Sequence, residues 1–151
     1  MRLHLQRVTR ARITIQGANI ASIDAGLLAL IGFGKADTQQ IVEQMLKKLL
    51  AYRLLADNQG KTNLSLAQAK GALLLVPQFT LYASTSRGLR PSYSNCAETS
   101  MARELFSHSL IHAKALCRTQ GIYLQHGRFG EDMQVELVND GPFTILLDSD
   151  G

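Results

Sequence analysis

The sequence Leu27-Leu28-Ala29-Leu30-Ile31-Gly32-Phe33 is an unbroken apolar run, and it decides the fold class. Such a run is typical of a β-strand whose two faces are both covered by other parts of the protein. The segment from Ala72 to Leu81 is also strongly apolar and predicts a second buried strand. Neither run approaches the roughly 20 apolar residues that a transmembrane helix needs, so no membrane partner is expected.

The residues before this run predict further β structure. Between Val8 and Ile15, the side chains follow a mixed pattern of period two, as in a strand. Gly17-Ala18-Asn19 predicts a hairpin turn, and Gly26 marks a second break just before the apolar run. We therefore expect β structure throughout residues 1–33.

Two main helices are predicted after the apolar run. The first follows Gly34-Lys35-Ala36, with Asp37 or Thr38 as its N-cap, and its apolar side chains recur at helical spacing. The second is expected from about Thr99 to Thr119, because an apolar stripe of helical period spans this segment and Gly121 can end it.

The remaining segments complete a mixed α+β fold. Residues 83–97 are polar and predict a loop whose length is typical of functional or mobile segments. Two further strands are expected at Met133–Val138 and Phe143–Leu147, joined by a turn at Asn139-Asp140-Gly141-Pro142. The order of elements predicts one compact domain over residues 1–151, with sheet packed on sheet and helices on one side.

Composition limits the class of protein. The chain has 151 residues, of which 46% are hydrophobic and 19% charged, as expected for a globular domain. It carries 16 Lys and Arg against 12 Asp and Glu, and the formal charge of +4 favours an anionic partner. The start of the chain, Met1 to Arg7, has no secretory apolar region, and Cys96 and Cys117 lack metal-binding spacing. We therefore expect a soluble, cytoplasmic protein.

Several reactive side chains have a simple structural interpretation. Glu104, His108 and His112 share one face of the second predicted helix, but that face lies opposite the apolar stripe, which favours a solvent-exposed surface over a metal site. Cys117 lies on the apolar stripe itself and is expected to pack in the core. The sequence shows no activated-serine motif. It also has no phosphate-binding loop and no cluster with metal-binding spacing, so neither a cofactor nor a metal is predicted.

Two motifs are not explained by composition. In Pro77-Gln78-Phe79-Thr80-Leu81, strand alternation would place Gln78 and Thr80 on one face, where both need hydrogen-bond partners. The second motif is Asn139-Asp140-Gly141-Pro142-Phe143-Thr144. An ordinary strand end and an ordinary hairpin turn remain open as interpretations. Because only about 5–6% of X-Pro bonds in folded proteins are cis, the residues alone do not predict a cis bond here.

Together these segments resemble the D-aminoacyl-tRNA deacylase family along essentially the whole chain. The motifs that carry the resemblance are, in order, Gln6-Arg7-Val8-Thr9-Arg10-Ala11, Gly26-Leu27-Leu28, Tyr52-Arg53, Gly60-Lys61-Thr62-Asn63-Leu64, Gln78-Phe79-Thr80-Leu81, Arg87-Gly88-Leu89-Arg90-Pro91-Ser92, Gly127-Arg128-Phe129-Gly130 with Asp132-Met133-Gln134-Val135, and Asn139-Asp140-Gly141-Pro142-Phe143-Thr144. Each motif alone is weak, whereas their common order and spacing are specific.

The resemblance implies a homodimeric hydrolase with a layered α/β/β fold and barrel-like sheets. Its substrate would be the ester between a D-amino acid, or glycine mischarged on tRNA(Ala), and the 3′-terminal adenosine of tRNA. Gly141 and Pro142 would form a cis peptide that enters the active site of the partner subunit. There the backbone would crowd the side on which an L side chain lies, so that L-aminoacyl-tRNA is rejected.

The same resemblance implies roles for the first motif. Thr80 is expected to be the catalytic side chain, as a positioning and polar-contact residue more than a nucleophile, with Gln78 beside it. Phe79 would contact the terminal adenosine or the wall of its pocket. The 2′-hydroxyl group of the substrate would assist the attack on the ester, while main-chain groups bind the carbonyl oxygen as charge develops.

Further residues are expected around this centre. Arg7 and Met133 would support the Gly141-Pro142 loop. The candidate phosphate contacts are basic residues in the other motifs, namely Arg87, Arg90 and Arg128. For each of these three, a solvated surface position is the alternative.

Pro77 departs from the family motif, which usually has Ser at this position. Proline removes a hydroxyl group and a backbone N–H. A related branch of the fold combines a P-Q-x-T-L motif with a trans Gly-Pro bond and deacylates some mischarged L-aminoacyl-tRNAs. Two alternatives therefore stay open: such an L-aminoacyl-tRNA deacylase, and a dimer that binds nucleic acid without catalysis, for which the charge of +4 is the motive.

Overall fold

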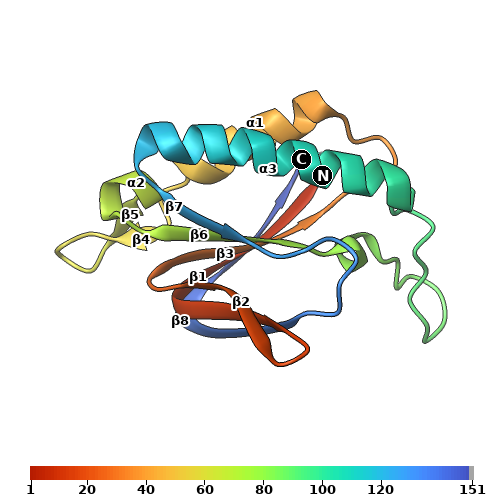
Figure 1. Ribbon diagram of the computed structural model, residues 1–151, viewed down its shortest axis with the longest axis horizontal. Helices are drawn as coiled ribbons and strands as arrows, with labels where there is room; N and C mark the ends of the chain where they lie inside the picture. The colour runs from red at the N-terminus through yellow and green to blue at the C-terminus, as the bar shows by residue number, and fades with distance from the viewer. Residues whose placement is uncertain (150–151) are drawn as a thin grey trace.

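A curved β-sheet forms the centre of the protein, and helices cover one of its faces (Figure 1). The computed structural model describes residues 1–149. Within this range the sheet consists of β1 (Arg2–Ile15), β2 (Ala18–Ile23), β3 (Gly26–Gly32), β6 (Ala72–Pro77), β7 (Tyr123–His126) and β8 (Gln134–Asp148). The strand order is β2-β1-β3-β6-β7. β3 pairs with the first half of β1 and β2 with its second half, on the same edge, and β8 pairs with the opposite edge of β1. The β3–β6 and β6–β7 pairs are parallel and the others antiparallel.

The helical layer consists mainly of α1 (Gln39–Ala51) and α3 (Thr99–Gln120), which lie above the sheet in Figure 1. A small unit at one end of the molecule contains α2 (Leu66–Ala69) and the two short strands β4 (Leu55–Ala56) and β5 (Thr62–Leu64). A 3₁₀ turn, η1 (Phe79–Tyr82), follows β6 at the opposite end of that strand. Within residues 1–149, no helix combines the length and the apolar character that a membrane crossing requires.

Both main helices lie where the sequence predicts them, and the predicted N-cap of α1 and the predicted stop of α3 are found. Thr38 is the N-cap of α1, and its Oγ1 accepts a hydrogen bond from the backbone N–H of Ile41. α3 begins at Thr99 and ends at Gln120, and its C-cap Gly121 has a φ of 67°, the left-handed conformation that glycine adopts without a steric penalty. The helix predictions are therefore confirmed.

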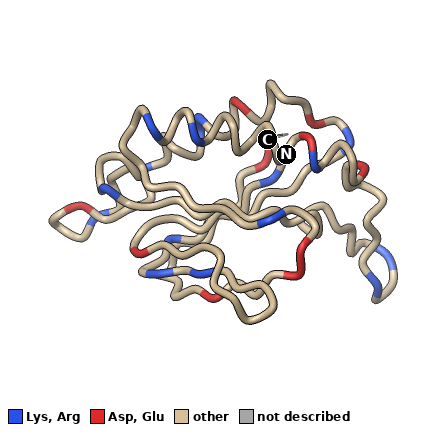
Figure 2. The backbone as a smooth tube through the Cα atoms, in the orientation of Figure 1, with Lys and Arg blue, Asp and Glu red and all other residues tan. Residues whose placement is uncertain are grey.

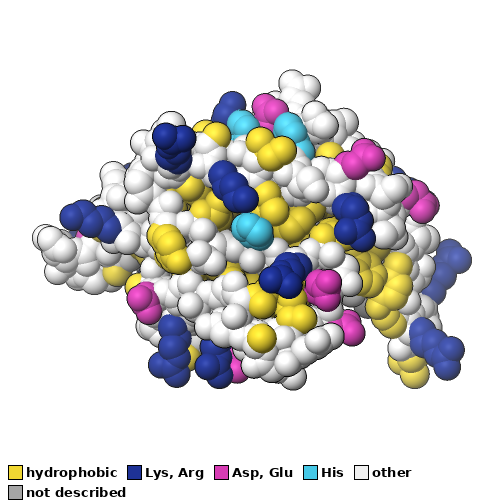
Figure 3. Space-filling model, in the orientation of Figure 1, with side chains coloured by type: hydrophobic (Ala, Val, Ile, Leu, Met, Phe, Trp, Pro, Cys, Tyr) yellow, Lys and Arg dark blue, Asp and Glu magenta, His cyan; other side chains and the backbone are white. Residues whose placement is uncertain are grey.

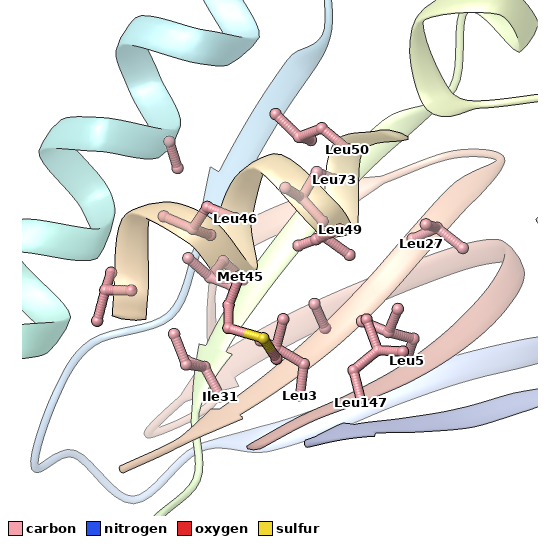
Figure 4. Close-up of a cluster of buried hydrophobic side chains, with 14 of the residues drawn as sticks. Leu3, Leu5, Leu27, Ile31, Met45, Leu46, Leu49, Leu50, Leu73 and Leu147 are labelled. Carbon is pink, nitrogen blue, oxygen red and sulfur yellow. The ribbon is translucent and has the colours of Figure 1, made fainter. Parts of the chain in front are cut away.

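Two hydrophobic clusters lie on opposite faces of β3 and β6. The cluster between the sheet and the helices contains, among others, Leu3, Leu5, Leu27, Ile31, Met45, Leu46, Leu49, Leu50, Leu73 and Leu147 (Figure 4). The second cluster contains Val8, Ala11, Ile13, Ala21, Ile23, Leu28, Ala72, Leu74 and Val76. Neighbouring residues such as Leu27 and Leu28 thus enter different clusters, which confirms that the strand is covered on both faces.

The second cluster exists because β1 bends. Leu3 and Leu5 face the helices, whereas Val8, Ala11 and Ile13 face the other cluster. The pairing of β1 with β8 shifts in register next to Arg7, and this shift carries the second half of β1 over the sheet. The result is the predicted α+β fold, with sheet packed on sheet and the helices on one side.

Two predictions about strands are wrong, and one strand was missed. The apolar segment from Ala72 does not continue as a strand to Leu81, because β6 ends at Pro77 and the η1 turn follows. The segments 133–138 and 143–147 are not two strands joined by a reversing turn, because both belong to β8, which runs antiparallel to β1 along its whole length. β7, between α3 and β8, was not predicted at all.

Candidate functional site

The chain leaves the sheet at Gln78 and turns sharply. The backbone N–H of Gln78 still donates to the carbonyl of Ile31 on β3, at 2.7 Å. Backbone hydrogen bonds from Leu81 to Gln78 (3.3 Å) and from Ala83 to Thr80 (3.0 Å) then close the η1 turn. The side-chain amide of Gln78 donates from Nε2 to Oγ1 of Thr80. The two side chains therefore meet as expected, but through the turn and not through alternation along a strand.

This turn presents several hydrogen-bond donors. Because the Thr80 hydroxyl accepts from Gln78, its own proton remains able to donate elsewhere. Within residues 1–149, the backbone N–H groups of Phe79 and Thr80 have no protein acceptor. In the same range no ionisable side chain is hydrogen-bonded to Thr80, so nothing there activates it as a nucleophile. The turn therefore has donors available for an acceptor atom of a ligand.

A cavity of about 630 Å³ opens beside the turn. Its size lies within the range of small-molecule sites, roughly 300–1,000 Å³. Its walls come from the end of β6 and the η1 turn, from the loop before α3, from the first turn of α3 and from the segment before β8; they include Gln78, Phe79, Tyr93, Cys96, Phe129 and Met133. The charged residues of the lining are Lys35, Glu98, Glu131 and Asp132.

Cys96 connects the loop before α3 to the turn. Its thiol donates a hydrogen bond from Sγ to the backbone oxygen of Phe79, at 3.4 Å. Partial burial raises the pKa of the Cys96 thiol, against a smaller lowering effect of Lys35, so the thiol stays protonated and able to donate at neutral pH. Sequence reasoning did not single out Cys96 or Tyr93 as site residues, because their positions depend on how the loop folds back.

The second motif forms a loop that protrudes from β8. Val8 pairs with Asn139 and Gln6 pairs with Thr144, so Arg7 alone faces residues 140–143. The extra residues cannot fit into the ladder and are pushed out of it. The Gly141-Pro142 peptide bond in this loop is cis, and both residues are exposed.

Arg7 lies directly beneath the loop and is only 9% exposed. Its guanidinium donates to the backbone oxygens of Asp140 (3.1 Å) and Leu54 (3.2 Å) and forms an ion pair with Oδ2 of Asp140 (2.8 Å). It also stacks over the ring of Phe143, 4.1 Å from its centroid. The side-chain amide of Asn139, a residue without a predicted role, donates to the backbone oxygen of Arg7 (2.9 Å). The loop is thereby fixed to both strands.

One chain does not bring the loop to the turn. The η1 end of the sheet lies beside Arg2, whose Nη1 donates to the backbone oxygen of Leu81 at 3.0 Å. The loop lies opposite Arg7, and the strand between Arg2 and Arg7 spans roughly 17 Å at about 3.3 Å per residue. Met133 does not lie at the loop either. It lines the cavity, and its sulfur accepts a hydrogen bond from the backbone of Arg128 (3.4 Å).

The predicted phosphate contacts are all exposed. Arg87 and Arg90 lie on the loop of residues 83–97, which is closed by two backbone hydrogen bonds between Ser84 and Ser92 (2.7 and 2.9 Å). Figure 2 shows basic residues at the tip of this loop, which extends away from the body of the protein. Arg128 lies apart from them, next to the wall of the cavity.

The histidines of α3 lie in a different environment from the one predicted. Nε2 of His108 lies 3.1 Å from a carboxylate oxygen of Glu43 on α1, and the rings of His108 and His112 stack with centroids 6.3 Å apart. This face is therefore partly covered by α1, and only Glu104 is fully exposed. Within residues 1–149 no three His, Cys, Asp or Glu side chains form a metal site. Cys117 packs in the core at 2% exposure, as predicted.

Known proteins are similar to this chain over nearly its whole length. The family model of D-Tyr-tRNA(Tyr) deacylase matches residues 4–148. The D-aminoacyl-tRNA deacylase of Teredinibacter turnerae is 46% identical over 149 residues, which cover 99% of this chain and 100% of that protein. The D-aminoacyl-tRNA deacylase of Pseudomonas putida is 48% identical over 147 residues, 97% of this chain and 99% of that one.

Solved structures show the same architecture. A c-Myc DNA unwinding element binding protein superimposes with a TM-score of 0.91 at 34% identity, covering 98% of both chains. A probable eukaryotic D-amino acid tRNA deacylase superimposes with a TM-score of 0.81 over 97% of both chains. Because that second protein is only 14% identical, its likeness concerns the fold alone.

Proposed function

The chain belongs to the D-Tyr-tRNA(Tyr) deacylase family, and from this premise we propose that it hydrolyses the ester bond of D-aminoacyl-tRNA, releasing the free D-amino acid and tRNA. The protein is a hydrolase, and its proposed substrates include glycine mischarged on tRNA(Ala). The observation that carries the proposal is the η1 turn, where Gln78 and Phe79 line a cavity of suitable size and the next residue, Thr80, is hydrogen-bonded to Gln78.

The reaction needs little from side chains. A water molecule attacks the ester carbonyl, the bond to the ribose oxygen breaks, and a proton passes to that oxygen. The neighbouring 2′-hydroxyl group of the ribose assists the attack on the ester. The backbone N–H groups of Phe79 and Thr80, together with the Thr80 hydroxyl, bind the carbonyl oxygen as negative charge develops on it. The absence of an ionisable partner for Thr80 within residues 1–149 fits this mechanism better than attack by Thr80 itself.

The cavity would hold the 3′-terminal adenosine. Gln78 and Phe79 belong both to the turn and to the cavity wall, so a nucleoside in the cavity would place its ribose ester at the turn. Phe129 and Met133 add apolar surface to the wall, which suits the faces of a purine.

Chiral selection would come from a second copy of the chain. In one chain the Gly141-Pro142 loop is exposed and lies far along β1 from the turn, so it is available to another molecule. β8 is an edge strand of 15 residues, and Val138 (40% exposed) and Leu146 (56% exposed) lie on it. An edge of this length with exposed apolar side chains favours association. Gly141 lacks a Cβ, so its backbone can approach the substrate closely and exclude an L side chain.

Pro77 does not disturb the turn. The N–H of Gln78 bonds to β3, and N–H groups alternate sides along a strand, so the nitrogen of Pro77 faces away from β3. No β3–β6 hydrogen bond is lost, and the pairing of β6 with β7 ends at Leu75, so no β7 ladder bond is lost at Pro77 either. The L-aminoacyl alternative is tested directly by comparing hydrolysis of D-alanyl-tRNA with that of L-alanyl-tRNA.

Release of D-tyrosine from D-tyrosyl-tRNA by the purified protein tests the proposal, with L-tyrosyl-tRNA as the matched substrate. We expect rapid hydrolysis of the D ester only. Thr80→Val should lower kcat roughly 100-fold, as loss of one preorganised donor does, while Thr80→Ser should retain most activity. If the D ester decays at its spontaneous rate in the presence of enzyme, the protein is not this deacylase. Binding of tRNA with a steep salt dependence and no turnover would then favour a nucleic-acid-binding dimer.

A further inference from the structure

Two exposed aromatic side chains, Phe79 and Tyr93, lie in contact at the edge of the cavity. Their ring centroids are 5.2 Å apart with an interplanar angle of 58°, and the residues are 56% and 44% exposed. Both also belong to the cavity lining, so the pair stands where the cavity meets solvent; we call it the aromatic rim. In Figure 3 hydrophobic side chains gather at the right-hand end of the molecule, beside the loop of residues 83–97.

Tyr93 is held firmly in this position. The backbone of Ser92 bonds to Ser84 on one side of it, and on the other side the N–H of Cys96 donates to the backbone oxygen of Tyr93 (3.1 Å). The next residue, Ala97, donates to the backbone of Phe33 at the end of β3 (3.0 Å). The backbone that carries Tyr93 is therefore fixed to the body of the protein, so little backbone conformational entropy would be lost when a ligand binds the rim.

The loop that carries Tyr93 has a one-sided charge. Residues 83–97 contain Arg87 and Arg90 and no Asp or Glu. An exposed aromatic surface next to such a basic segment is the combination with which proteins bind unpaired nucleic acid. Bases stack on the rings, and the phosphates lie near the guanidinium groups.

The path of the substrate leads past this surface. With the terminal adenosine in the cavity and its ester at the η1 turn, the 5′ phosphate must leave through the mouth, which the aromatic rim borders. The nucleotides that precede the terminal adenosine are unpaired at the 3′ end of tRNA, so their bases are free to stack. This step rests on the proposed function.

We propose that the aromatic rim binds the base of the nucleotide immediately 5′ of the terminal adenosine, with Tyr93 as the stacking surface. Arg87 and Arg90 then lie toward the phosphates of the preceding nucleotides. The rim thus recognises the single-stranded end of the RNA, independently of the amino acid.

Two substrates of different length isolate this contact. D-tyrosyl-tRNA contains the upstream nucleotides, whereas 3′-O-D-tyrosyl-adenosine lacks them. We compare the kcat/KM of the tRNA ester with that of the adenosine ester as a ratio. In Tyr93→Leu we expect this ratio to decrease by a factor of about 5 to 150, because the stacking of one base is lost. The loss should lie in KM and not in kcat. Tyr93→Phe, which keeps an aromatic ring, should restore the ratio.

Tyr123→Leu is the matched control. Tyr123 is 60% exposed and pairs with Ala72 at the other end of β6, away from the cavity. Its replacement should leave the ratio unchanged. A folding defect, or a defect in the adenosine site itself, lowers kcat/KM for both substrates together and leaves their ratio unchanged. An unchanged ratio in Tyr93→Leu therefore overturns the proposal, whether or not activity falls.

Binding provides a second readout that does not depend on catalysis. Fluorescence anisotropy of a labelled single-stranded oligonucleotide ending in CCA should show weaker binding to Tyr93→Leu than to wild type, Tyr93→Phe or Tyr123→Leu. If the wild type hydrolyses neither ester, the proposed function fails, but this binding comparison still shows whether the aromatic rim binds a base. Equal binding by all four proteins refutes it.

Discussion

The buried side chain of Arg7 should be the main support of the Gly141-Pro142 loop, and Arg7→Met tests this. The substitution keeps an apolar side chain of similar length but removes the guanidinium. Two hydrogen bonds of 3.1 and 3.2 Å to backbone oxygens and the ion pair with Asp140 are lost. Hydrogen bonds of charged groups contribute roughly 1.5–3 kcal/mol each. Arg7 also makes longer contacts with Oγ1 of Thr62 (3.4 Å) and the backbone oxygen of Gly141 (3.5 Å), to which we assign nothing.

We therefore expect Arg7→Met to lower the free energy of unfolding by roughly 3–6 kcal/mol. Domains of this size are stable by roughly 5–15 kcal/mol, so the variant should fold at 25 °C with a much lower urea midpoint. Arg7→Lys retains the charge but cannot reach both backbone oxygens at once, and should lie between the variant and the wild type.

Urea unfolding followed by circular dichroism measures the effect, with Arg12→Met as control. Arg12 lies on the same strand and pairs with Glu136 of β8, but both side chains are more than half exposed (55% and 58%). A surface pair of this kind contributes little, so the control should unfold near the wild-type midpoint. Deacylation by folded Arg7→Met should also fall, because the loop is no longer fixed. Equal midpoints for the two variants would refute this role of Arg7.

Three further substitutions or measurements follow from single contacts. Gly141→Ala should fold normally, because the new Cβ would meet only one side-chain oxygen at an ordinary 3.6 Å; deacylation should nevertheless fall, and full activity would contradict the proposed approach of this backbone to the substrate. Gly26→Ala should abolish cooperative unfolding in calorimetry, because its Cβ would lie 1.9 Å from the backbone oxygen of Ala72; a normal transition would contradict the β3–β6 packing. Burial raises the pKa of the Cys117 thiol to about 11, so at pH 8 a thiol reagent should modify Cys96 and leave Cys117 unreacted until the protein unfolds. Since that pKa is about 8.5 in an unfolded chain, stability should fall as the pH rises from about 8.5 towards 11, and equal labelling of both thiols in the folded protein would contradict the burial.

The parts of the fold that sequence reasoning predicted correctly depend on local signals. The Leu27–Phe33 run is apolar on both faces, and the structure covers both faces. Thr38 caps the start of α1, where its side-chain oxygen accepts from a nearby N–H group. Gly121 caps the end of α3, where its left-handed backbone lets its own N–H bond to the last carbonyl groups. Such interactions involve residues within a few positions of each other, so a single sequence contains them.

The segment Asn139–Phe143 shows why the rest was not predictable. Asn-Asp-Gly-Pro has the composition of a reversing turn, but the chain continues in the same direction on β1 after it. The deciding information is the pairing partner, more than 130 positions away, and the buried guanidinium of Arg7 that satisfies the carbonyl of Asp140. No local propensity encodes such a contact.

The end of β6 was mispredicted for a related reason. Ala72–Leu81 is apolar enough to continue as a strand, but the hydrogen bond from Gln78 to Ile31 is the last one that β3 accepts before the chain turns away. The pairing of Gln78 with Thr80 was expected for the wrong geometry. It arises because a 3₁₀ turn, like an extended strand, can bring side chains two positions apart within reach.

The scarcity of reactive side chains has a structural consequence. In the proposed mechanism the substrate would bind to the backbone of Phe79 and Thr80. Binding would then depend on where these atoms lie, because backbone chemistry is the same in every protein. Selectivity must then reside in the groups that fix backbone position: Arg7 beneath the protruding loop and Cys96 against the η1 turn. Both are hydrogen-bonded to backbone oxygens and neither needs to touch the ester. Substitutions at these two positions should therefore test the geometry of the site more directly than substitutions that remove a reactive group.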